Sequence, residues 1–503
     1  MHDLIAHLVY GFSVALSVQN VALCFVGALV GTLVGVLPGI GPIATIAMLL
    51  PITFGLEPTS ALIMLAGIYY GAQYGSSTTA ILMSIPGEAS STVTCLDGHE
   101  MAKRGRAGIA LGISAIGSFF AGSVATIFVA GLAIPLTNVA LRFGPVEFFS
   151  LMVMGLVFAA ALARGSMLNA VIAIVFGVLL SSIGPDLVTG QLRMTFGVNE
   201  LADGIDFAIL GMGLFGIGEI LRNLEHSMSR EVLKRRIGRL LPGRKELRQS
   251  AWPIVRGTMV GAGLGILPGN GAVLGAFASY TIEKKVAKNP SRFGAGAIEG
   301  VAGPESANNA GAQTSFVPLL TLGIPPNAVM AIMVGAMTIH GIVPGPQVIT
   351  ARPDLFWGLI ASMWIGNLML LVINLPMIGI WVKLLAVPYR MLFPAIILFC
   401  CIGVFSLNGS TVEIALLAAF GLLGYAMSKL GFEPAPLALG MVLGARMEEA
   451  LRQSMIISGG DFLIFVTRPI SAALLLGAAI LVGVVLVPQI RKRREEVFAE
   501  EEE

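Results

Sequence analysis

Apolar stretches long enough to enter a lipid bilayer recur along the whole chain of 503 residues. A helix needs about 20 predominantly apolar residues to cross the hydrocarbon core. Five stretches approach or exceed this length: residues 110–136, 148–162, 168–183, 359–382 and 470–487. In lipid the backbone polar groups must bond within their own segment, so these stretches predict helices. We expect an all-α polytopic membrane protein with about 10–12 transmembrane helices.

A polar run interrupts this pattern at residues 69–87, YYGAQYGSSTTAILMSIPG. At bilayer depth its amide and hydroxyl groups have no water and each needs another partner. The apolar arm that follows, residues 81–85, is too short to cross, which predicts a re-entrant hairpin whose tip opens residues 73–79 to a water-filled cavity. The alternative is that these small residues only let helices pack closely. The expected substrate contacts here are Gln73, Tyr74, Gly75, Ser76, Ser77 and Thr78.

The chain contains an internal duplication. GTLVGVLPGIG at 31–41 returns as GAGLGILPGNG at 261–271, and GAQYGSSTTAILMSIP at 71–86 returns as GAQTSFVPLLTLGIP at 311–325. Two further pairs follow in the same order, 163–180 with 407–424 and 210–222 with 439–452. The predicted organisation is an N-terminal helix (1–20), a first repeat (21–222), a linker (223–252), a second repeat (253–455), a final transmembrane helix (456–490) and a charged tail (491–503).

The linker indicates how the repeats are oriented. From Arg222 to Arg248 it holds nine Lys or Arg residues and three Glu, and the tail begins with four basic residues. The positive-inside rule places both in the cytoplasm. Only one spanning stretch separates Arg452, the counterpart of Arg222, from the tail, so the two positions should lie on opposite faces. This predicts inverted-topology repeats, a plan common among secondary transporters.

The second copy of the polar run, ESANNAGAQTSFVPLLTLGIPP at 305–326, predicts a second hairpin over residues 308–325. Transporters of this plan bind substrate near the midplane, where equivalent broken segments meet. We therefore expect Asn308, Asn309, Gln313 and Thr314 to complete the substrate site. Gln73 and Gln313 should then face each other across one cavity.

The repeated LPGxG motif predicts two broken helices, because proline removes a backbone donor and glycine permits sharp bends. Freed carbonyls there could hold a cation, with Glu305 as its charged ligand or as a proton site. The alternatives are a tight loop at the membrane face and an interfacial glutamate. The expected cation-binding residues are Pro38, Gly39, Gly41, Pro268, Gly269, Asn270, Gly271 and Glu305. A solvated loop is expected after the first hairpin, with Glu88, Asp97, His99, Glu100, Lys103, Arg104 and Arg106.

Composition excludes several classes of function. The chain is 56% hydrophobic and 12% charged, whereas soluble domains carry roughly a quarter charged residues. It has no GxxxxGK[ST] loop for ATP and no HExxH or other metal-binding motif, and nothing favours nucleic acid. We expect no cofactor, and an ion gradient, Na⁺ or H⁺, as the energy source.

The quoted motifs, above all EGVAGPESANNA with LGIP, resemble the large membrane subunit of the tripartite tricarboxylate transporter family. The resemblance covers essentially the whole chain. It implies a bacterial inner-membrane symporter for tricarboxylates such as citrate or related organic acids, driven by Na⁺ or H⁺. The implied partners are a periplasmic solute-binding protein and a small four-helix membrane subunit. It also suggests kinship with the ion-transporter superfamily and an elevator motion.

Two other classes stay open at this point. An intramembrane enzyme would need a nucleophile and base, and His99, His340 and the scattered acids do not assemble into such a set. A channel subunit would need neither an ion gradient nor a binding protein.

Overall fold

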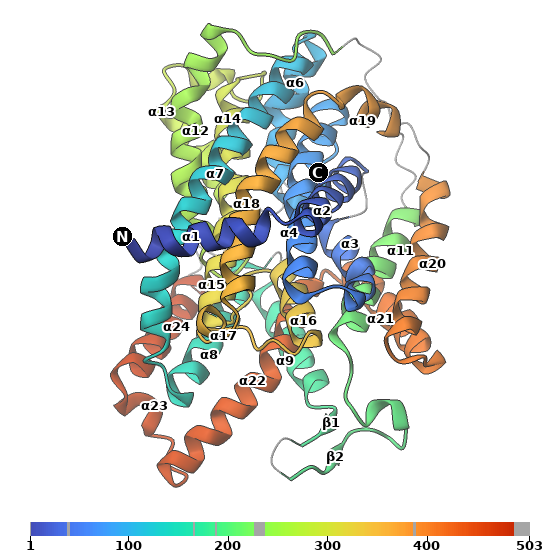
Figure 1. Cartoon of the computed structure of the whole chain (residues 1–503), viewed down its shortest axis with the longest axis vertical. Helices are drawn as coiled ribbons and strands as arrows, with labels where there is room; N and C mark the ends of the chain where they lie inside the picture. Colours follow the sequence, from blue (N-terminus) through green and yellow to red (C-terminus); the bar gives the residue numbers. More distant parts are fainter. Residues whose placement is uncertain are drawn as a thin grey trace.

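The computed structural model describes residues 2–37, 41–163, 166–186, 189–225, 237–385 and 389–486. Helices account for most of these residues, as the apolar pattern predicts (Figure 1). Six helical stretches are long and apolar enough to cross a membrane: Val18–Val36, Ala107–Ala140, Pro145–Leu162, Phe207–Glu225, Pro353–Asn374 and Thr411–Lys429. Six shorter apolar helices of 10–17 residues accompany them. The figure of about 10–12 crossings stays a prediction.

The first part of the chain begins with α1 (His2–Ala15), α2 (Val18–Val36), α3 (Pro42–Leu49), η1 (Leu50–Gly55) and the long α4 (Pro58–Met83). Four short elements follow: η2 (Ala89–Ser91), α5 (Thr92–Thr94), η3 (Cys95–His99) and α6 (Glu100–Lys103). Next come α7 (Ala107–Ala140), α8 (Pro145–Leu162), α9 (Met167–Ser181), the antiparallel pair β1 (Gly184–Pro185) and β2 (Leu192–Arg193), and η4 (Asn199–Leu201). A helix in three segments ends this part: α10 (Phe207–Gly211), η5 (Met212–Ile217) and α11 (Gly218–Glu225).

The second part opens with α12 (Arg244–Gly265), α13 (Gly271–Val286) and η6 (Pro290–Arg292), followed by α14 (Glu299–Thr314), α15 (Phe316–Leu322) and α16 (Ala328–Ile339). It continues with α17 (Val348–Ala351), α18 (Pro353–Asn374), α19 (Ile378–Leu385), α20 (Tyr389–Asn408) and α21 (Thr411–Lys429). The last elements are α22 (Pro434–Ser458), α23 (Ile464–Thr467) and α24 (Pro469–Leu486). Figure 1 shows α12, α13 and α14 together at the upper end of the molecule and α22 and α23 at the lower end.

Glycines bring equivalent helix pairs of the two parts into close contact. In α2, three glycines lie against the backbone of α4: Gly27, Gly31 and Gly35. In α12, three glycines lie in the same way against α14: Gly257, Gly261 and Gly265. A Cβ at any of them would overlap a backbone carbonyl of the facing helix. The small-residue stripe predicted for packing therefore serves that purpose in both parts.

The later helices of each part pack against helices of the other part. α9 contacts α22, with Gly177 against the backbone of Leu437 and Gly440 against that of Ile174. In the same manner α21 contacts η5, with Gly424 against the backbone of Leu214. α9 and α21 cover most of the equivalent sequence stretches 163–180 and 407–424. These reciprocal contacts support an internal duplication, while the domain boundaries and the inverted orientation stay predictions.

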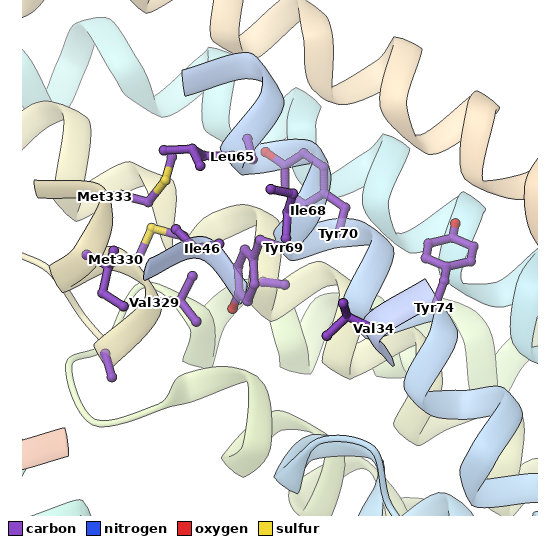
Figure 2. Packing of buried hydrophobic residues seen from close by; sticks show 14 of the residues in the cluster. Val34, Ile46, Leu65, Ile68, Tyr69, Tyr70, Tyr74, Val329, Met330 and Met333 are labelled. Carbon is purple, nitrogen blue, oxygen red and sulfur yellow. The ribbon is translucent and has the colours of Figure 1, made fainter. Parts of the chain in front are cut away.

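The core is centred on α4, whose residues Thr59 to Met83 are all buried. Figure 2 shows Val329, Met330 and Met333 of α16 beside Ile46 of α3 and Leu65 of α4, three helices that contact one another. Further along α4, the rings of Tyr69 and Tyr70 pack at a tilt against the ring of Phe316. Their centroids lie 6.4 and 5.8 Å from that of Phe316. This packing holds the helix breaks described below at fixed positions.

The predicted hairpin tip at residues 73–79 is wrong. These residues lie within the unbroken helix α4, and every one of them is buried. The chain reverses later, at Ser84, which has a left-handed φ of 58°. Runs of Ala, Ser and Thr have no strong breaking effect when their hydroxyls bond to the helix backbone or to neighbouring helices, so polarity alone did not mark the break.

The predicted solvated loop after α4 is also wrong in part. Asp97 is fully buried, and its Oδ1 accepts from the backbone N–H groups of Gly294, Gly296 and Ala297 at 2.7–3.0 Å. Its Oδ2 accepts from the Tyr280 hydroxyl at 3.0 Å. Asp97 therefore joins the two parts of the chain. Lys103 and Arg104 are exposed, as expected.

A second ionic contact joins the two parts outside the six candidate spans. Arg193 of β2 and Arg452 of α22 both donate to Glu448, each at 2.7 Å. The hydrogen bond from Arg193 holds the pKa of the Glu448 carboxyl below its usual range. Arg452 also donates to Asp186 at 2.7 Å. The counterpart of Arg222 thus anchors the β1–β2 segment to α22.

Candidate functional site

Breaks in the helices occur at equivalent places in the two parts. α4 ends at Ser84 and α15 ends at Gly323, both with positive φ, and an Ile-Pro pair follows each. α12 ends before Pro268, and α13 restarts after Asn270, which also has a positive φ of 66°. The matching break between α2 and α3 lies around residues 38–40, outside the described residues, so nothing is placed there for Pro38 and Gly39. Proline and left-handed residues end a helix for local reasons, so the sequence encodes these breaks directly.

All four breaks border one cavity of about 540 Å³. Each contributes a short stretch of chain to its wall: Gly41–Pro42, Gly87–Glu88, Gly269–Asn270 and Pro326–Asn327. Two of them are bonded directly, since the N–H groups of Gly269 and Asn270 donate to the carbonyl of Pro326 at 2.8 and 3.3 Å. Other parts of the wall come from α4, α8, η5, α11, α21 and the segment that leads into α22. A volume of this size suits a small organic molecule.

Four helices begin at the wall of the cavity. α3 starts at Pro42, α13 follows Asn270, α16 starts after Asn327, and α22 starts at Pro434. The first backbone N–H groups of a helix lack intrahelical acceptors, and the helix dipole adds positive potential there. Several such ends around one cavity favour an anion.

The ionisable side chains of the wall oppose that field. Among the described residues, Glu88, Glu219 and Glu433 line the cavity together with one guanidinium, that of Arg222. The Oε1 atom of Glu219 lies 3.9 Å from Nη2 of Arg222, and its carboxylate lies beside the backbone N–H of Gly41. An anion entering this cavity therefore meets carboxylates as well as helix N-termini.

A second polar cluster lies behind the cavity, centred on Glu305 of α14. Its carboxylate is fully buried and accepts hydrogen bonds from three hydroxyls, those of Ser77, Thr94 and Ser114. The Thr94 and Ser114 bonds measure 2.5 and 2.9 Å. Among the described residues no Lys, Arg or His forms an ion pair with it. A carboxylate and hydroxyl oxygens from α4, α5 and α7 form an all-oxygen cluster of the kind that hard cations prefer.

Several amides near this cluster have hydrogen-bonding capacity that the described residues do not use. Asn308 is fully buried, and neither its Oδ1 nor its Nδ2 has a partner there. The same holds for Gln73 Nε2 and Gln313 Oε1. Buried polar atoms are normally paired, so these groups mark places where a ligand or water could bind. Asn309 differs, because its Nδ2 donates to Ser118 Oγ at 2.8 Å and to the Glu305 carbonyl at 3.0 Å.

One short segment connects the cavity to the Glu305 cluster. In residues 88–94, Glu88 and Thr92 line the cavity. In the same segment Ser90 donates to Gln73 Oε1 at 3.1 Å, and Thr94 donates to Glu305. Residues 88–94 therefore contact both the cavity and the Glu305 cluster.

The predicted residues fall into two groups. Gly41, Gly269 and Asn270 line the cavity, whereas Gln73, Tyr74, Gly75, Ser76, Ser77 and Thr78 belong to the buried layer of α4. Asn308, Asn309, Gln313 and Thr314 belong to the buried layer of α14. The cavity is lined by neither Gln73 nor Gln313, so their expected meeting across it stays a prediction.

Tyr69, Glu88, Glu219 and Asn327 are among the lining residues that were not assigned to the site from the sequence. The duplication held the signal for two of them. Glu88 and Asn327 are equivalent, since each follows an Ile-Pro pair by the same spacing and stands at the N-cap position of the next helix, although only Asn327 makes a side-chain capping bond. No group of three His, Cys, Asp or Glu residues within the described part could hold a metal ion.

Fold and site together define a multi-pass helical membrane protein with a polar cavity among broken helices. Residues 21–439 match the family described as "Tripartite tricarboxylate transporter TctA family", and the chain belongs to this family. The expected family is thereby confirmed. A protein of Agrobacterium vitis described as "Uncharacterized 52.8 kDa protein in TAR-I ttuC' 3'region" is 56% identical over 502 residues, covering 100% of both chains.

A second protein of Agrobacterium vitis, "Uncharacterized protein in TAR-II ttuC' 3'region", is 59% identical over 242 residues, which is 48% of this chain and 100% of that protein. No solved structure matches the chain. The family is one of transporters, which disfavours the intramembrane enzyme as the function of this chain.

Proposed function

We propose that this chain is the large permease subunit of a binding-protein-dependent secondary transporter. It imports tricarboxylates such as citrate, or related organic acids, by symport with Na⁺ or H⁺. The observation that carries the proposal is the convergence of four helix breaks, and of four helix N-termini, on one cavity. Family membership supports the same conclusion.

The substrate carboxylates bind where the broken helices restart. Backbone N–H groups at the starts of α3, α13 and α16, with the amides of Asn270 and Asn327, provide donors without a fixed positive charge. Binding of this kind is selective for anions yet weak enough per contact to allow release. The buried residues of α4 and α14 form the layer behind these donors, and it includes the unpaired atoms Gln73 Nε2 and Gln313 Oε1 and the Asn308 amide.

The coupling cation binds at the Glu305 cluster. There the carboxylate supplies the charge, and Ser77, Thr94 and Ser114 supply neutral oxygen ligands. Carbonyls near residues 38–41 and 268–271 are further candidate ligands for a cation. A cation within the protein offsets the repulsion between the wall carboxylates and an anionic substrate. Symport follows because the substrate site is complete only after the cation is bound.

Transport proceeds by an elevator motion of one set of helices, within a fold of two inverted repeats related to the ion-transporter superfamily. The reciprocal packing of α9 with α22 and of α21 with η5 supports a duplicated scaffold of this kind. The linker 223–252 and the C-terminus lie in the cytoplasm of a bacterial inner membrane. A periplasmic binding protein delivers the substrate, and a small four-helix subunit completes the complex.

Reconstitution tests this proposal. The chain is placed in proteoliposomes with the small subunit, the binding protein is added outside, and radiolabelled citrate and succinate are followed under imposed Na⁺ or proton gradients. We expect at least one acid to accumulate, and accumulation to stop when the gradient is collapsed or the binding protein is omitted. Equilibration without a gradient would indicate a channel, and chemical conversion of the acid would indicate an enzyme. Either result contradicts the proposal.

A further inference from the structure

Glu88 occupies an unusual place in the cavity wall. It stands at the N-cap position of η2 (Ala89–Ser91), directly after the break that ends α4. Its Oε2 atom is shielded from solvent and accepts no hydrogen bond from any described residue. No basic side chain in the described part forms an ion pair with it. An ionised carboxylate left in this state is costly, and the cost disappears when the group takes up a proton.

The neighbours of Glu88 are neutral. The Gln73 carboxamide and the Tyr69 hydroxyl lie beside it, and Gln73 is fully buried with an Nε2 atom that lacks an acceptor. These groups lie near the carboxyl without compensating its charge. They suit a group that changes between ionised and neutral forms.

Other ionisable groups on the elements around η2 have partners of their own or face solvent. η2 packs against α4, α5, α13 and α14. Glu305 of α14 is bonded to three hydroxyls, Tyr280 of α13 to Asp97, and Glu283 of α13 to Arg256. Glu299 of α14 accepts from Gln249 and Arg292, and Lys284 and Lys285 are exposed. The other two wall carboxylates also have partners. Glu219 Oε1 lies 3.9 Å from Arg222 Nη2, and Glu433 is not without a partner either.

The equivalent position in the other repeat is Asn327, which also lines the cavity and caps α16 through its side-chain oxygen. An asparagine amide is neutral and donates a hydrogen bond at any pH. A glutamic acid is its functional equivalent only when protonated. At these two equivalent positions, Asn327 is a hydrogen-bond donor at any pH, whereas Glu88 is a donor only when it is protonated.

Resting on the proposed function, we propose that Glu88 binds a proton together with the carboxylate substrate. The carboxylate of Glu88 gains one proton as the substrate enters, and the resulting O–H donates to a substrate carboxylate. On the cytoplasmic side the substrate leaves and the same proton is released. Each cycle thereby moves one proton inward with the substrate, besides any cation at Glu305.

Glu88→Gln tests this directly, because the amide mimics the protonated acid and cannot titrate. In the reconstituted complex we measure the initial rate of radiolabelled citrate uptake against external pH. The wild-type rate should fall by about tenfold per pH unit above its transition, as expected for one required proton. Glu88→Gln should lose this slope and lose accumulation driven by a proton gradient, while it keeps citrate exchange across the membrane. Glu88→Asp should restore a pH-dependent rate.

A matched variant outside the cavity serves as the control. Glu100→Gln removes a carboxylate that pairs with Lys103 away from the cavity, and its uptake should match the wild type. The titration of citrate itself affects all variants equally.

The proposal is overturned if Glu88→Gln keeps the wild-type pH slope and accumulation under a proton gradient. It is also overturned if the variant changes only the Na⁺ requirement, since Glu88 would then be a sodium ligand. If the wild type accumulates neither citrate nor succinate under any gradient, the proposed function itself fails.

Discussion

At the scale of single residues, the site depends on hydroxyls and amides that the surrounding helices position. Glu305 is the clearest case, because a buried carboxylate with three hydroxyl donors can exchange part of this shell for a cation. Its ligands come from three elements that are separate in sequence. The three hydroxyls therefore reach Glu305 only because the fold brings these elements together.

Thr94→Val removes one of these hydroxyls with almost no change of shape. A hydrogen bond to a charged group contributes about 1.5–3 kcal/mol, so we expect the cation concentration for half-maximal citrate uptake to rise about tenfold or more. The measurement is uptake against external Na⁺ and against proton concentration. Thr350→Val, at an exposed threonine that bonds only to the Gln347 carbonyl, is the control. An unchanged cation dependence in Thr94→Val would exclude Glu305 as the cation site.

The residues of the candidate site could be predicted only in part from the sequence. Asn308, Glu305 and the LPGxG glycines were predicted as binding residues because a repeated polar motif in an apolar chain needs a reason, and their role stays a prediction. Glu88 was assigned to a solvated loop because it stands among charged residues along the chain. Only the fold shows that the break at Ser84 turns it into the cavity.

At the scale of elements, glycine stripes and helix breaks determine the architecture. α2 lies so close to α4, and α12 to α14, that only glycine fits at the contact positions. A helix break follows each of these closely packed helices, and the chain at the break lines the cavity. Both features are local and were visible in the sequence as GTLVG, GAGLG and LPGxG.

Gly31→Leu and Gly261→Leu should be equally harmful, since the two glycines are equivalent. Forcing a large side chain between packed backbones costs about 1–3 kcal/mol or more. We expect a lower melting temperature in detergent and a lower folded yield for both variants. Gly263→Leu is the matched control, because an added Cβ there meets nothing within 4 Å. A stable Gly31→Leu variant would show that α2 and α4 are not in close contact.

The continuity of α4 was the main failure at this scale. Five polar residues within 73–79 suggested a hairpin tip, but in the structure three of them bond to neighbouring groups. Ser76 bonds to Ser91, Ser77 to Glu305, and Thr79 to the Val36 carbonyl. These partners lie 15 to 228 residues away in sequence, so local sequence could not reveal them.

At the scale of the whole molecule, the two parts of the chain are joined by buried polar contacts as well as by apolar packing. Asp97 accepts three backbone N–H groups from the segment before α14, and Arg452 holds Asp186 and Glu448. These contacts fix one part against the other around the cavity.

Asp97→Ala should therefore loosen the segment 290–297 without touching the cavity. It leaves three N–H groups without their acceptor, and the loss should cost about 1–3 kcal/mol for the buried N–H of Ala297 and less for the other two. Hydrogen exchange should become faster in this segment, and the melting temperature should fall. Glu100→Ala, which removes an exposed ion pair worth at most about 1 kcal/mol, should change neither. Slow exchange retained in Asp97→Ala would contradict the role assigned to Asp97.

The central claim is that the cavity among the four helix breaks binds the carboxylate substrate. Thiol labelling tests it most directly: in a chain with Cys24, Cys95, Cys400 and Cys401 replaced by alanine, Ala328→Cys places a thiol at the start of α16. With the partner subunits present, citrate and the coupling cation together should slow its labelling, while a thiol at the exposed Ser291 is unaffected. Equal labelling of Ala328→Cys with and without citrate or succinate, in a preparation that transports these acids, would contradict the account.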